Sequence, residues 1–401
     1  MNFELSKDQQ LLQESAQRYL EKSYTFEHHQ TVAGSGGFSR DTWSTLAEMG
    51  WLMVNIPEAH SGLGFSAVES ALLAEQIGRG LVLEPYTMCG LFPASLVRLC
   101  AAEVQKSALL GAIGSGEQLL AVAHSEEHSR GELAQVRTRA HRVGSGYVLS
   151  GRKTLVVGGP VADRLIVVAR SDGMPGQSAG LSAFLIDRSA PGVRLEAYQL
   201  LDGTPAADLI LEEASVPAGA LLGSEGGAFA GLQRAIDETI VALCAETVGG
   251  LEDVISLTSE YVKTRRQFGV PIGSFQVLQH RLADMAIERM LARATLHRAL
   301  EVLANPDRRD PSVLIGGCKA QITRSARFVT AQGIQLHGGY GITEEYRVGH
   351  HWRRRVLTDA LFGNLDHHLN RYAQLIRSEA RAAGASLAPA IDPTKDRPKS
   401  A

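Results

Sequence analysis

The spacing of apolar residues changes twice along the chain, and this double change limits the fold more than any other feature. Apolar residues recur every three or four positions up to about residue 115, then in short β-branched runs from about Leu119, and again at helical spacing from about Gly226. Helical spacing predicts amphipathic helices, whereas short β-branched runs between turns predict strands. The chain is therefore predicted to be α+β, with a β domain between two helical domains.

Two segments near the N-terminus predict helix starts. Ser6-Lys-Asp-Gln9 and Ser66-Ala-Val-Glu69 both match the capping box, in which two side chains satisfy each other's backbone N–H groups at the first turn of a helix. Between them, residues 50–64 are punctuated by Gly and Pro and predict a loop. The first region is therefore expected to consist of helices joined by an irregular segment.

The central region predicts a compact, mostly antiparallel β domain without a long helix. Turn-forming residues such as Gly144-Ser-Gly146 separate its β-branched runs. The predicted strands are Leu119–Val122, Gln135–Val143, Tyr147–Leu149, Leu155–Val157, Leu165–Val168, Ala183–Ile186 and Leu209–Leu211.

The last part of the chain predicts long antiparallel helices with short loops. One apolar stripe runs through Leu232, Ile236 and Ile240, and residues 269–273 interrupt the helical spacing. The tail is rich in Ala, Pro and charge without periodicity, which predicts disorder. The expected domains are an N-terminal helical domain (1–117), a β domain (118–224), a C-terminal four-helix-bundle domain (225–383) and a disordered tail (384–401).

Composition argues against several classes of protein. A formal charge of −3 provides no basic surface of the kind that nucleic acid requires. The sequence has no long uncharged apolar run, so no membrane span is predicted, and its N-terminus lacks the pattern of a signal peptide. The four cysteines have no paired spacing, so free thiols in a reducing cytoplasm are expected.

Two segments about 70 residues apart, Val262–Gln276 and Gly333–Glu345, predict a ligand site. Each places hydrogen-bond donors and glycines beside an amphipathic helix. Arg265 provides a forked donor that is always charged, and Gly338-Gly339 allow the backbone to approach a ligand closely. This combination suits a cofactor that carries phosphate groups.

These segments, the order of the three domains, and the motifs at 56–64 and 75–79 resemble the acyl-CoA dehydrogenase family over nearly the whole chain. The resemblance implies FAD as the cofactor, an acyl-CoA thioester as the substrate and an electron-transfer acceptor. It also implies an oligomer, because in the family these positions of one subunit reach the FAD seated mainly in its neighbour. The FAD-binding residues that the resemblance implies are Arg265, Gln267, Phe268, Gln276, Gln335, Gly338, Gly339 and, at the flavin ring, Ser125.

The positions expected around the flavin ring depart from the family pattern. Ser125-Glu126 corresponds to a Thr-Glu turn that touches the ring, and it keeps the hydroxyl. Leu155-Val156-Val157 corresponds to a Trp-Ile-Thr stretch, so apolar side chains replace the aromatic shield and the hydroxyl that bonds flavin N5. His128–Glu132 also differs from the family's Gly- and Ser-rich loop near the acyl-CoA phosphates.

The family's catalytic base is missing from both of its usual positions. In the family, a carboxylate in a dry site with a raised pKa removes the proton next to the thioester carbonyl while hydride passes to flavin N5. Phe362 and Thr239 occupy the two usual positions here. Glu238 is the first candidate for a replacement, although it lies about 100° around a helix from Thr239, and Asp366 is the second.

Other polar residues in this region are expected to be structural. Asp237 is expected to be solvated and Glu246 to pair with a nearby cation. Solvation is also the structural alternative for Glu238, and a helix cap is the structural alternative for Asp366. The doublets His350-His351 and His367-His368 have no acid or thiol at ligand spacing, and adjacent helical side chains diverge by about 100°. No metal site is therefore predicted.

The run 348–369 resembles the small, or second, subunit of two-component bacterial acyl-CoA dehydrogenases, which serve dicarboxylic or steroid side-chain thioesters. The leading hypothesis is therefore one subunit of a heteromeric, heterotetrameric FAD-dependent acyl-CoA dehydrogenase with the base on the partner chain. One alternative is a self-sufficient homo-oligomer that uses Glu238 or Asp366. The others are a non-catalytic assembly protein and a related flavin oxidase or monooxygenase on the same fold.

Overall fold

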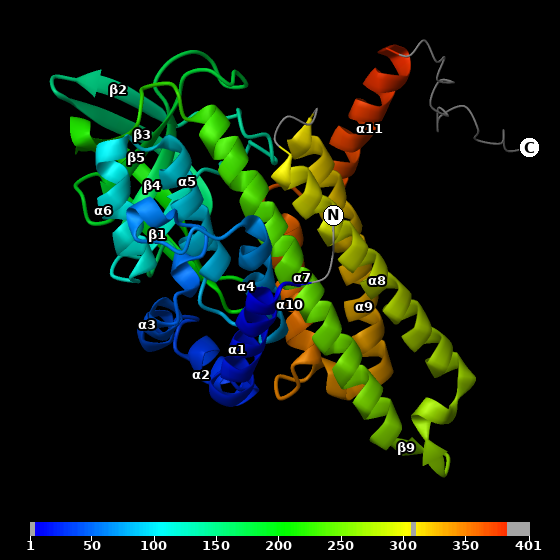
Figure 1. Cartoon of the computed structure of the whole chain (residues 1–401). Helices are drawn as coiled ribbons and strands as arrows, with labels where there is room; N and C mark the ends of the chain where they lie inside the picture. Colours follow the sequence, from blue (N-terminus) through cyan, green and yellow to red (C-terminus); the bar gives the residue numbers. More distant parts are fainter. Residues whose placement is uncertain (1–4, 306–309, 383–401) are drawn as a thin grey trace, which may run out of the picture.

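The computed structural model describes residues 5–305 and 310–382, which follow the predicted order of helices, sheet and helical bundle (Figure 1). The predicted fold class is therefore confirmed. The tail predicted for residues 384–401 lies outside the described residues. Within the described part of the chain, no helix is both long and apolar enough to cross a membrane.

The N-terminal region is helical, and both predicted capping boxes form at its helix starts. Ser6 Oγ accepts a hydrogen bond from the backbone N–H of Gln9 at 3.2 Å, and the Glu69 carboxylate accepts one from the backbone N–H of Ser66 at 2.9 Å. A buried π-helical stretch, Tyr86–Leu91, leads into α5. The helices are α1 (Lys7–Ser23), α2 (Phe26–Gly34), α3 (Arg40–Glu48), α4 (Ala67–Arg79), α5 (Phe92–Cys100) and α6 (Glu103–Gly114).

The β region is one eight-stranded sheet in the spatial order β6-β7-β3-β2-β4-β5-β8, with β1 beside β4. Most neighbouring strands are antiparallel, as predicted, but β1 runs parallel to β4 and β2 meets β4 in parallel at one pair. The strands are β1 (Leu120–Ala123), β2 (Arg139–Val143), β3 (Gly146–Val157), β4 (Arg164–Arg170), β5 (Leu181–Asp187), β6 (Val193–Gln199), β7 (Pro205–Pro217) and β8 (Leu221–Leu222).

The sheet differs from the sequence prediction in two places. The strands predicted at 147–149 and 155–157 are parts of one strand, β3, which pairs with β7 through irregularities in register. Sequence analysis does not predict β6, which lies at the edge of the sheet and exposes most of its residues. A core constrains few residues of such an edge strand, so its sequence carries a weak pattern.

The C-terminal region is a helical bundle, as predicted. The helix α7 extends over 36 residues and contacts α4, α8 and α9, and Figure 1 shows it running through the middle of the molecule. A short hairpin of β9 (Arg266–Gln267) and β10 (Val270–Pro271) joins α7 to α8 where the helical spacing breaks. The helices are α7 (Phe229–Thr264), α8 (Gln276–Ala304), α9 (Pro311–His337), α10 (Val348–Ala360) and α11 (Leu365–Ala382).

The N-terminal helices are fixed to the bundle where α4 crosses α7. A Cβ at Gly78 would lie 1.9 Å from the carbonyl oxygen of Glu246, and a Cβ at Gly249 would lie 1.9 Å from that of Glu75. Only glycine permits two helix backbones to approach this closely. The Glu75 side chain also pairs with Arg293 of α8 at 2.5 Å, so α4 is held against two helices of the bundle.

Candidate functional site

A large cleft lies between the β region and the C-terminal bundle, with a volume of about 1020 Å³. Both regions contribute to its walls, and a cavity of this size is typical of a site for a small molecule or cofactor. Its walls come from the loop 124–135, from Thr154 and Leu155 of β3, from the first turns of α7, from Ser312 of α9, and from residues 356–371 around the start of α11.

An aromatic side chain, Phe362, forms part of the wall of the cleft. The Phe362 ring stacks on His124 with centroids 5.1 Å apart and meets Phe92 edge-on at 5.4 Å. The φ of 56° at Phe362 is a left-handed conformation, which costs a residue with a Cβ about 1–2 kcal/mol. Leu155 lines the same cleft with a φ of 55°. Arg130, with a φ of 46°, also lines the cleft, and three such residues in one cleft are typical of a functional site.

A buried lysine fixes the loop that carries Phe362. The Lys319 ammonium donates to the backbone carbonyls of Asp359 at 3.0 Å, Leu361 at 2.6 Å and Gly363. These three acceptors use all three protons of the ammonium group. Burial lowers the pKa of Lys319 to about 8. The aromatic wall of the cleft is therefore held in place by the bundle behind it.

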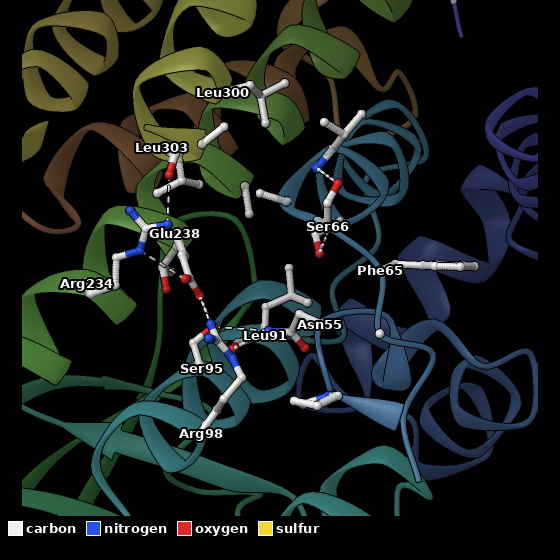
Figure 2. A pocket seen from close by; sticks show the side chains of 18 of the residues that line it. Asn55, Phe65, Ser66, Leu91, Ser95, Arg98, Arg234, Glu238, Leu300 and Leu303 are labelled. Atoms are coloured by element: carbon white, nitrogen blue, oxygen red, sulfur yellow. Dashed lines mark hydrogen bonds and ion pairs between the residues drawn. The ribbon is translucent and has the colours of Figure 1, made fainter. Parts of the chain in front are cut away.

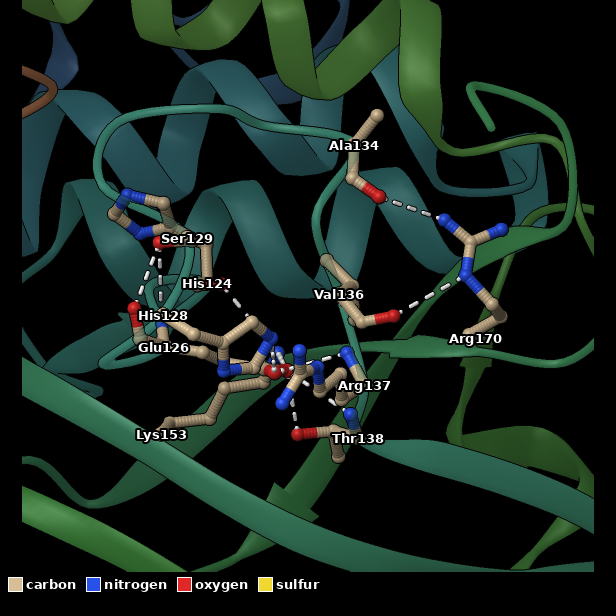
Figure 3. Close-up of polar contacts among 10 residues, drawn as sticks. All are labelled: His124, Glu126, His128, Ser129, Ala134, Val136, Arg137, Thr138, Lys153 and Arg170. Atoms are coloured by element: carbon tan, nitrogen blue, oxygen red, sulfur yellow. Dashed lines mark hydrogen bonds and ion pairs between the residues drawn. The ribbon is translucent and has the colours of Figure 1, made fainter. Parts of the chain in front are cut away.

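Ser125 lines the cleft, and the next residue in the chain, Glu126, forms a buried ion pair with Lys153 (Figure 3). Glu126 accepts hydrogen bonds from Lys153 Nζ at 2.7 Å, from the backbone N–H of Arg137 at 2.8 Å and from that of Thr138 at 3.0 Å. Burial raises the pKa of Glu126, but Lys153 and these bonds outweigh it and the net shift is downward. Burial lowers the pKa of Lys153 to about 8, against the opposing effect of Glu126.

The far side of the same loop is held by Arg170 of β4, which has no exposed surface. Its guanidinium donates to the carbonyl of Ala134 at 2.8 Å and to that of Val136 at 3.2 Å (Figure 3). Residues 124–138 therefore form a loop that is pinned at both sides, although it has little regular structure of its own.

The cleft contains a carboxyl group that sequence analysis set aside. The expectation that Asp237 is solvated is wrong, since the residue is 3% exposed and lines the cleft. It accepts hydrogen bonds from Ser312 Oγ at 2.6 Å and Gln233 Nε2 at 3.2 Å, and burial raises its pKa to about 6. Its position beside the stripe through Ile236 and Ile240 is the sequence signal that indicates burial.

Asp237→Asn should stabilise the protein by about 1–2 kcal/mol at pH 7.5. The pKa of the Asp237 carboxyl is 3.8 in the unfolded chain and about 6 in the folded protein, so the folded state binds this proton more tightly. The stability of the protein therefore falls as pH rises from about 4 to about 6. Two pKa units correspond to about 3 kcal/mol, and weaker bonds to Ser312 and Gln233 reduce the gain. Urea unfolding of the variant and the unaltered chain at pH 4 and at pH 7.5 measures this gain in stability. The exposed Asp366→Asn is the control, and an equal effect of both variants would contradict the prediction.

The other two expected structural carboxylates also have defined places. Glu246 is buried, accepts a hydrogen bond from Thr87 Oγ1 and lies 3.5 Å from Arg354, so its predicted cation pair is confirmed. Asp366 lies in the first turn of α11 and lines the cleft, but the cap of that helix is Asn364, whose Oδ1 accepts from the backbone N–H of His367 at 3.0 Å. The expected capping role of Asp366 is therefore wrong.

Glu238 lies in a second cavity, of about 540 Å³, away from the cleft (Figure 2). One of its carboxylate oxygens accepts from Ser95 Oγ and from Arg98 Nη2, both at 2.6 Å, and the other accepts from Arg234 Nε at 3.3 Å. Thr239 lines the same second cavity. Neither residue therefore shares the cleft with Ser125, Phe362 and Asp366.

The two segments with predicted FAD-binding residues meet at the far end of the bundle. Tyr261 Oη donates to the carbonyl of His337 at 3.4 Å, and its ring stacks on Tyr340 at 6.1 Å. Phe268 in the hairpin is 92% exposed, and a Cβ at Gly338 or Gly339 would meet no atom within 4 Å. The other predicted residues at this end are Arg265, which directly follows α7, Gln267 in β9, Gln276 at the start of α8, and Gln335 in the last turn of α9.

The predicted FAD-binding residues lie in two separate places within one chain. Ser125 is at the cleft, and the others are at the far end of the bundle. Asp237 lies in the cleft, as does Ser125, whereas Arg265 is at the other end of α7. At a rise of 1.5 Å per residue, about 40 Å of helix separates Asp237 from Arg265.

The doublet His350-His351 has polar and aromatic neighbours, whereas both ring nitrogens of His368 have no hydrogen-bond partner among the described residues. His351 Nε2 lies 2.8 Å from Asp253 Oδ2, and the His350 ring meets His29 edge-on. Burial lowers the pKa of His368 to about 3, so this residue of the cleft is neutral. Within the described ranges, no three His, Cys, Asp or Glu side chains are placed to hold a metal ion.

Three family models match the chain in order. They are the N-terminal domain (residues 6–117), the middle domain (121–214) and the C-terminal domain (229–376) of acyl-CoA dehydrogenase. Cyclohex-1-ene-1-carbonyl-CoA dehydrogenase of Syntrophus aciditrophicus is 31% identical over 324 residues, which cover 79% of this chain and 78% of that protein. The chain belongs to the acyl-CoA dehydrogenase family. Its fold is that of oxidoreductases of this type.

Two solved structures share the architecture of this chain. A chain of the ChsE4–ChsE5 complex from Mycobacterium tuberculosis is 25% identical, with a TM-score of 0.83 over 94% of this chain and 99% of that chain. A chain from the FAD complex of PigA is 24% identical, with a TM-score of 0.87 over 94% of this chain and 100% of that one. The second likeness shows the fold alone, and the first is to one chain of a two-protein complex.

Proposed function

We propose that this chain is an FAD-dependent acyl-CoA dehydrogenase subunit and that a homologous partner chain supplies the catalytic base. The observation that supports the proposal is that Phe362, the residue the sequence predicts at the position of the family's base, lines the cleft and cannot accept a proton. Lys319 donates to three backbone carbonyls of the loop around Phe362 and holds this side chain at the wall of the cleft. The substrate would be an acyl-CoA thioester dehydrogenated at its α,β carbons.

The residues at the far end of the bundle fit a flavin dinucleotide held across a subunit interface. Arg265 and Phe268 are exposed there, and the backbone at Gly338 and Gly339 is open. A charged guanidinium suits the pyrophosphate, a flat ring suits the adenine or flavin face, and bare backbone suits close approach. FAD bound there would supply the hydride acceptor. Because about 40 Å of α7 separates this end from the cleft, these residues would serve the cofactor of a neighbouring subunit.

Exposed apolar side chains on α8 support an assembly. Contiguous exposed apolar surface on a globular protein marks a contact with another molecule. A homologous chain would cover these residues in a heterotetramer or other oligomer, and one similar structure is itself a complex of two proteins, ChsE4 and ChsE5. The exposed apolar residues of α8 are Val277, Ile287, Met290 and Leu291.

Reduction of the flavin by an acyl-CoA, followed by visible absorbance in a stopped-flow instrument, tests the proposal. The chain purified alone should be reduced at least about a hundredfold more slowly than the chain purified with the product of a neighbouring homologous gene, because a positioned base contributes about 10²–10⁴ in rate. Both a straight-chain and a steroid side-chain thioester serve as substrates. Rapid reduction of the lone chain would overturn the heteromeric assignment.

A self-sufficient homo-oligomer is the second candidate function, and Asp237 is the observation that favours it. Sequence analysis gives Glu238 and Asp366 as candidate bases of such an enzyme. In the structure, however, the buried Asp237 lines the cleft, and burial raises its pKa to about 6. A pKa near the working pH suits a general base. If the lone chain is active, Asp237→Asn should abolish flavin reduction while Glu238→Gln should not. If neither the lone chain nor the chain purified with its partner shows flavin absorbance, the protein is the non-catalytic assembly protein. Rapid oxygen consumption during turnover would instead indicate the flavin oxidase or monooxygenase.

A further inference from the structure

Two consecutive residues of β3, Thr154 and Leu155, both line the cleft. In a regular strand, neighbouring side chains point to opposite faces of the sheet, so only one of the two would reach the cleft. The pairing of β3 with β7 shifts in register between Lys153 and Val156. Two residues of β3 therefore lie opposite one residue of β7, Asp208, which is the arrangement of a β-bulge. Bulges re-aim side chains and are common beside active sites.

The side chain of Asp208 holds this bulge in place. Its Oδ1 accepts hydrogen bonds from the backbone N–H of Leu155 at 3.3 Å and from Tyr198 Oη at 3.0 Å. Its Oδ2 accepts one from Arg152 Nη2 at 2.8 Å. Leu155 has a φ of 55°, which is unfavourable for a residue with a Cβ and persists only where neighbouring contacts hold it. The bond from Leu155 to Asp208 is such a contact.

The bulge also places Thr154 beside Ser125. The backbone N–H of Thr154 donates to the carbonyl of Ser125 at 3.0 Å, so β3 is joined here to the loop after β1. Both residues line the cleft, and neither hydroxyl group forms a hydrogen bond with another described residue. Both residues are partly exposed, and neither hydroxyl oxygen is among the buried polar atoms that lack a partner. Two accessible hydroxyl groups from different segments are therefore available on one wall of the cleft.

We propose that Thr154 binds the polar edge of the flavin beside Ser125 and that Asp208 is the residue that positions it. The inference rests on the proposed function, because it takes the flavin ring to lie at Ser125. A flavin ring is flat and largely apolar with nitrogen and oxygen atoms along its edge, which suits two hydroxyl groups next to the apolar Leu155. Val157, where the sequence predicts the loss of the family's hydroxyl, is 3% exposed and does not line the cleft. Thr154 supplies a hydroxyl to the wall in its place.

Thr154→Val tests the binding role, because it removes the hydroxyl but keeps the branched shape and the backbone N–H. FAD is titrated into the full chain, together with its partner where one is required, and flavin fluorescence gives the affinity. The variant should bind FAD about threefold to tenfold more weakly, which is the effect of one hydrogen bond. Thr31→Val removes a hydroxyl on the exposed side of α2 and should leave the affinity unchanged. Equal affinities of the Thr154 variant and the unaltered chain would overturn the role of Thr154. No FAD binding by the unaltered chain or its assembly would overturn the proposed function as well.

Hydrogen exchange at the Leu155 amide, measured by mass spectrometry on peptides that cover it, tests the positioning role without a bound flavin. Asp208→Ala removes the acceptor, so this amide should exchange at least about tenfold faster, and FAD should bind at least about threefold more weakly. Asp208→Asn keeps an oxygen for Leu155 and Tyr198, although its NH2 group cannot accept from Arg152, and should restore both values to within about twofold. Arg152→Ala removes the ion pair alone and should change neither value beyond about twofold. Unchanged exchange in Asp208→Ala would overturn the positioning role. Equal effects of the Ala and Asn variants would overturn it too, because the loss would then follow the charge and not the acceptor.

Discussion

Lys153→Met should lower the free energy of unfolding by about 3–5 kcal/mol. The substitution removes the ammonium that lies 2.7 Å from Glu126 and leaves a carboxylate that is 4% exposed without its counter-charge. Breaking a buried ion pair from one side costs this much because the remaining charge stays desolvated. Urea unfolding followed by circular dichroism measures the loss. A loss below about 1 kcal/mol would show that the pair is not buried in solution as it is in the structure.

Two further variants isolate the charge as the cause. Lys153→Met combined with Glu126→Gln should recover part of the loss, since no unpaired charge remains and the amide oxygen still accepts from the N–H group of Thr138, although the amide NH2 group cannot accept from that of Arg137. Arg40→Met breaks the exposed pair with Asp163 at 2.9 Å and should cost less than about 1 kcal/mol. Equal losses for Lys153→Met and the double variant would assign the effect to packing and not to charge.

The fold was predictable because its signals are local. A capping box needs four residues, and both boxes form hydrogen bonds in the structure. The change from helical to β-branched spacing likewise depends on neighbours in sequence. The unpredicted β6 lacks such a signal, as its residues are constrained by pairing with β7 and little by burial. The sequence also splits β3, because irregularities in register interrupt its alternation near Gly151.

Only part of the candidate site was predictable, because the positions of its side chains depend on packing between distant segments. Periodicity gives the angle between Asp237 and Glu238 around α7, but it does not say which face meets the β region. That choice depends on packing, which buries Asp237 in the cleft and pairs Glu238 with Arg98 of α5. The solvation expected for Asp237 is wrong for the same reason. Distant contacts that set a pKa, such as the one with Ser312, leave no local pattern in the sequence.

Arg265→Ala in the assembled enzyme should weaken FAD binding about ten- to a hundredfold. The prediction rests on the proposed role of Arg265 at the pyrophosphate, where hydrogen bonds from a guanidinium to a charged group contribute about 1.5–3 kcal/mol. Arg265 is exposed at the end of α7, so the melting temperature of the chain itself should hardly change. Flavin released on gel filtration and a fluorescence titration with FAD measure the loss.

The neighbouring arginine separates a specific contact from general charge. Arg266 is also exposed, but its guanidinium donates to the carbonyl of Gly269 at 2.9 Å within the hairpin. Arg266→Ala therefore removes the same charge and should leave FAD affinity within about threefold of the unaltered value. Because about 40 Å of α7 lies between Arg265 and the cleft, a loss of FAD in the Arg265 variant alone requires that the cofactor be shared between subunits. Retention of FAD by the Arg265 variant would contradict that sharing, and with it the assembly proposed for this chain.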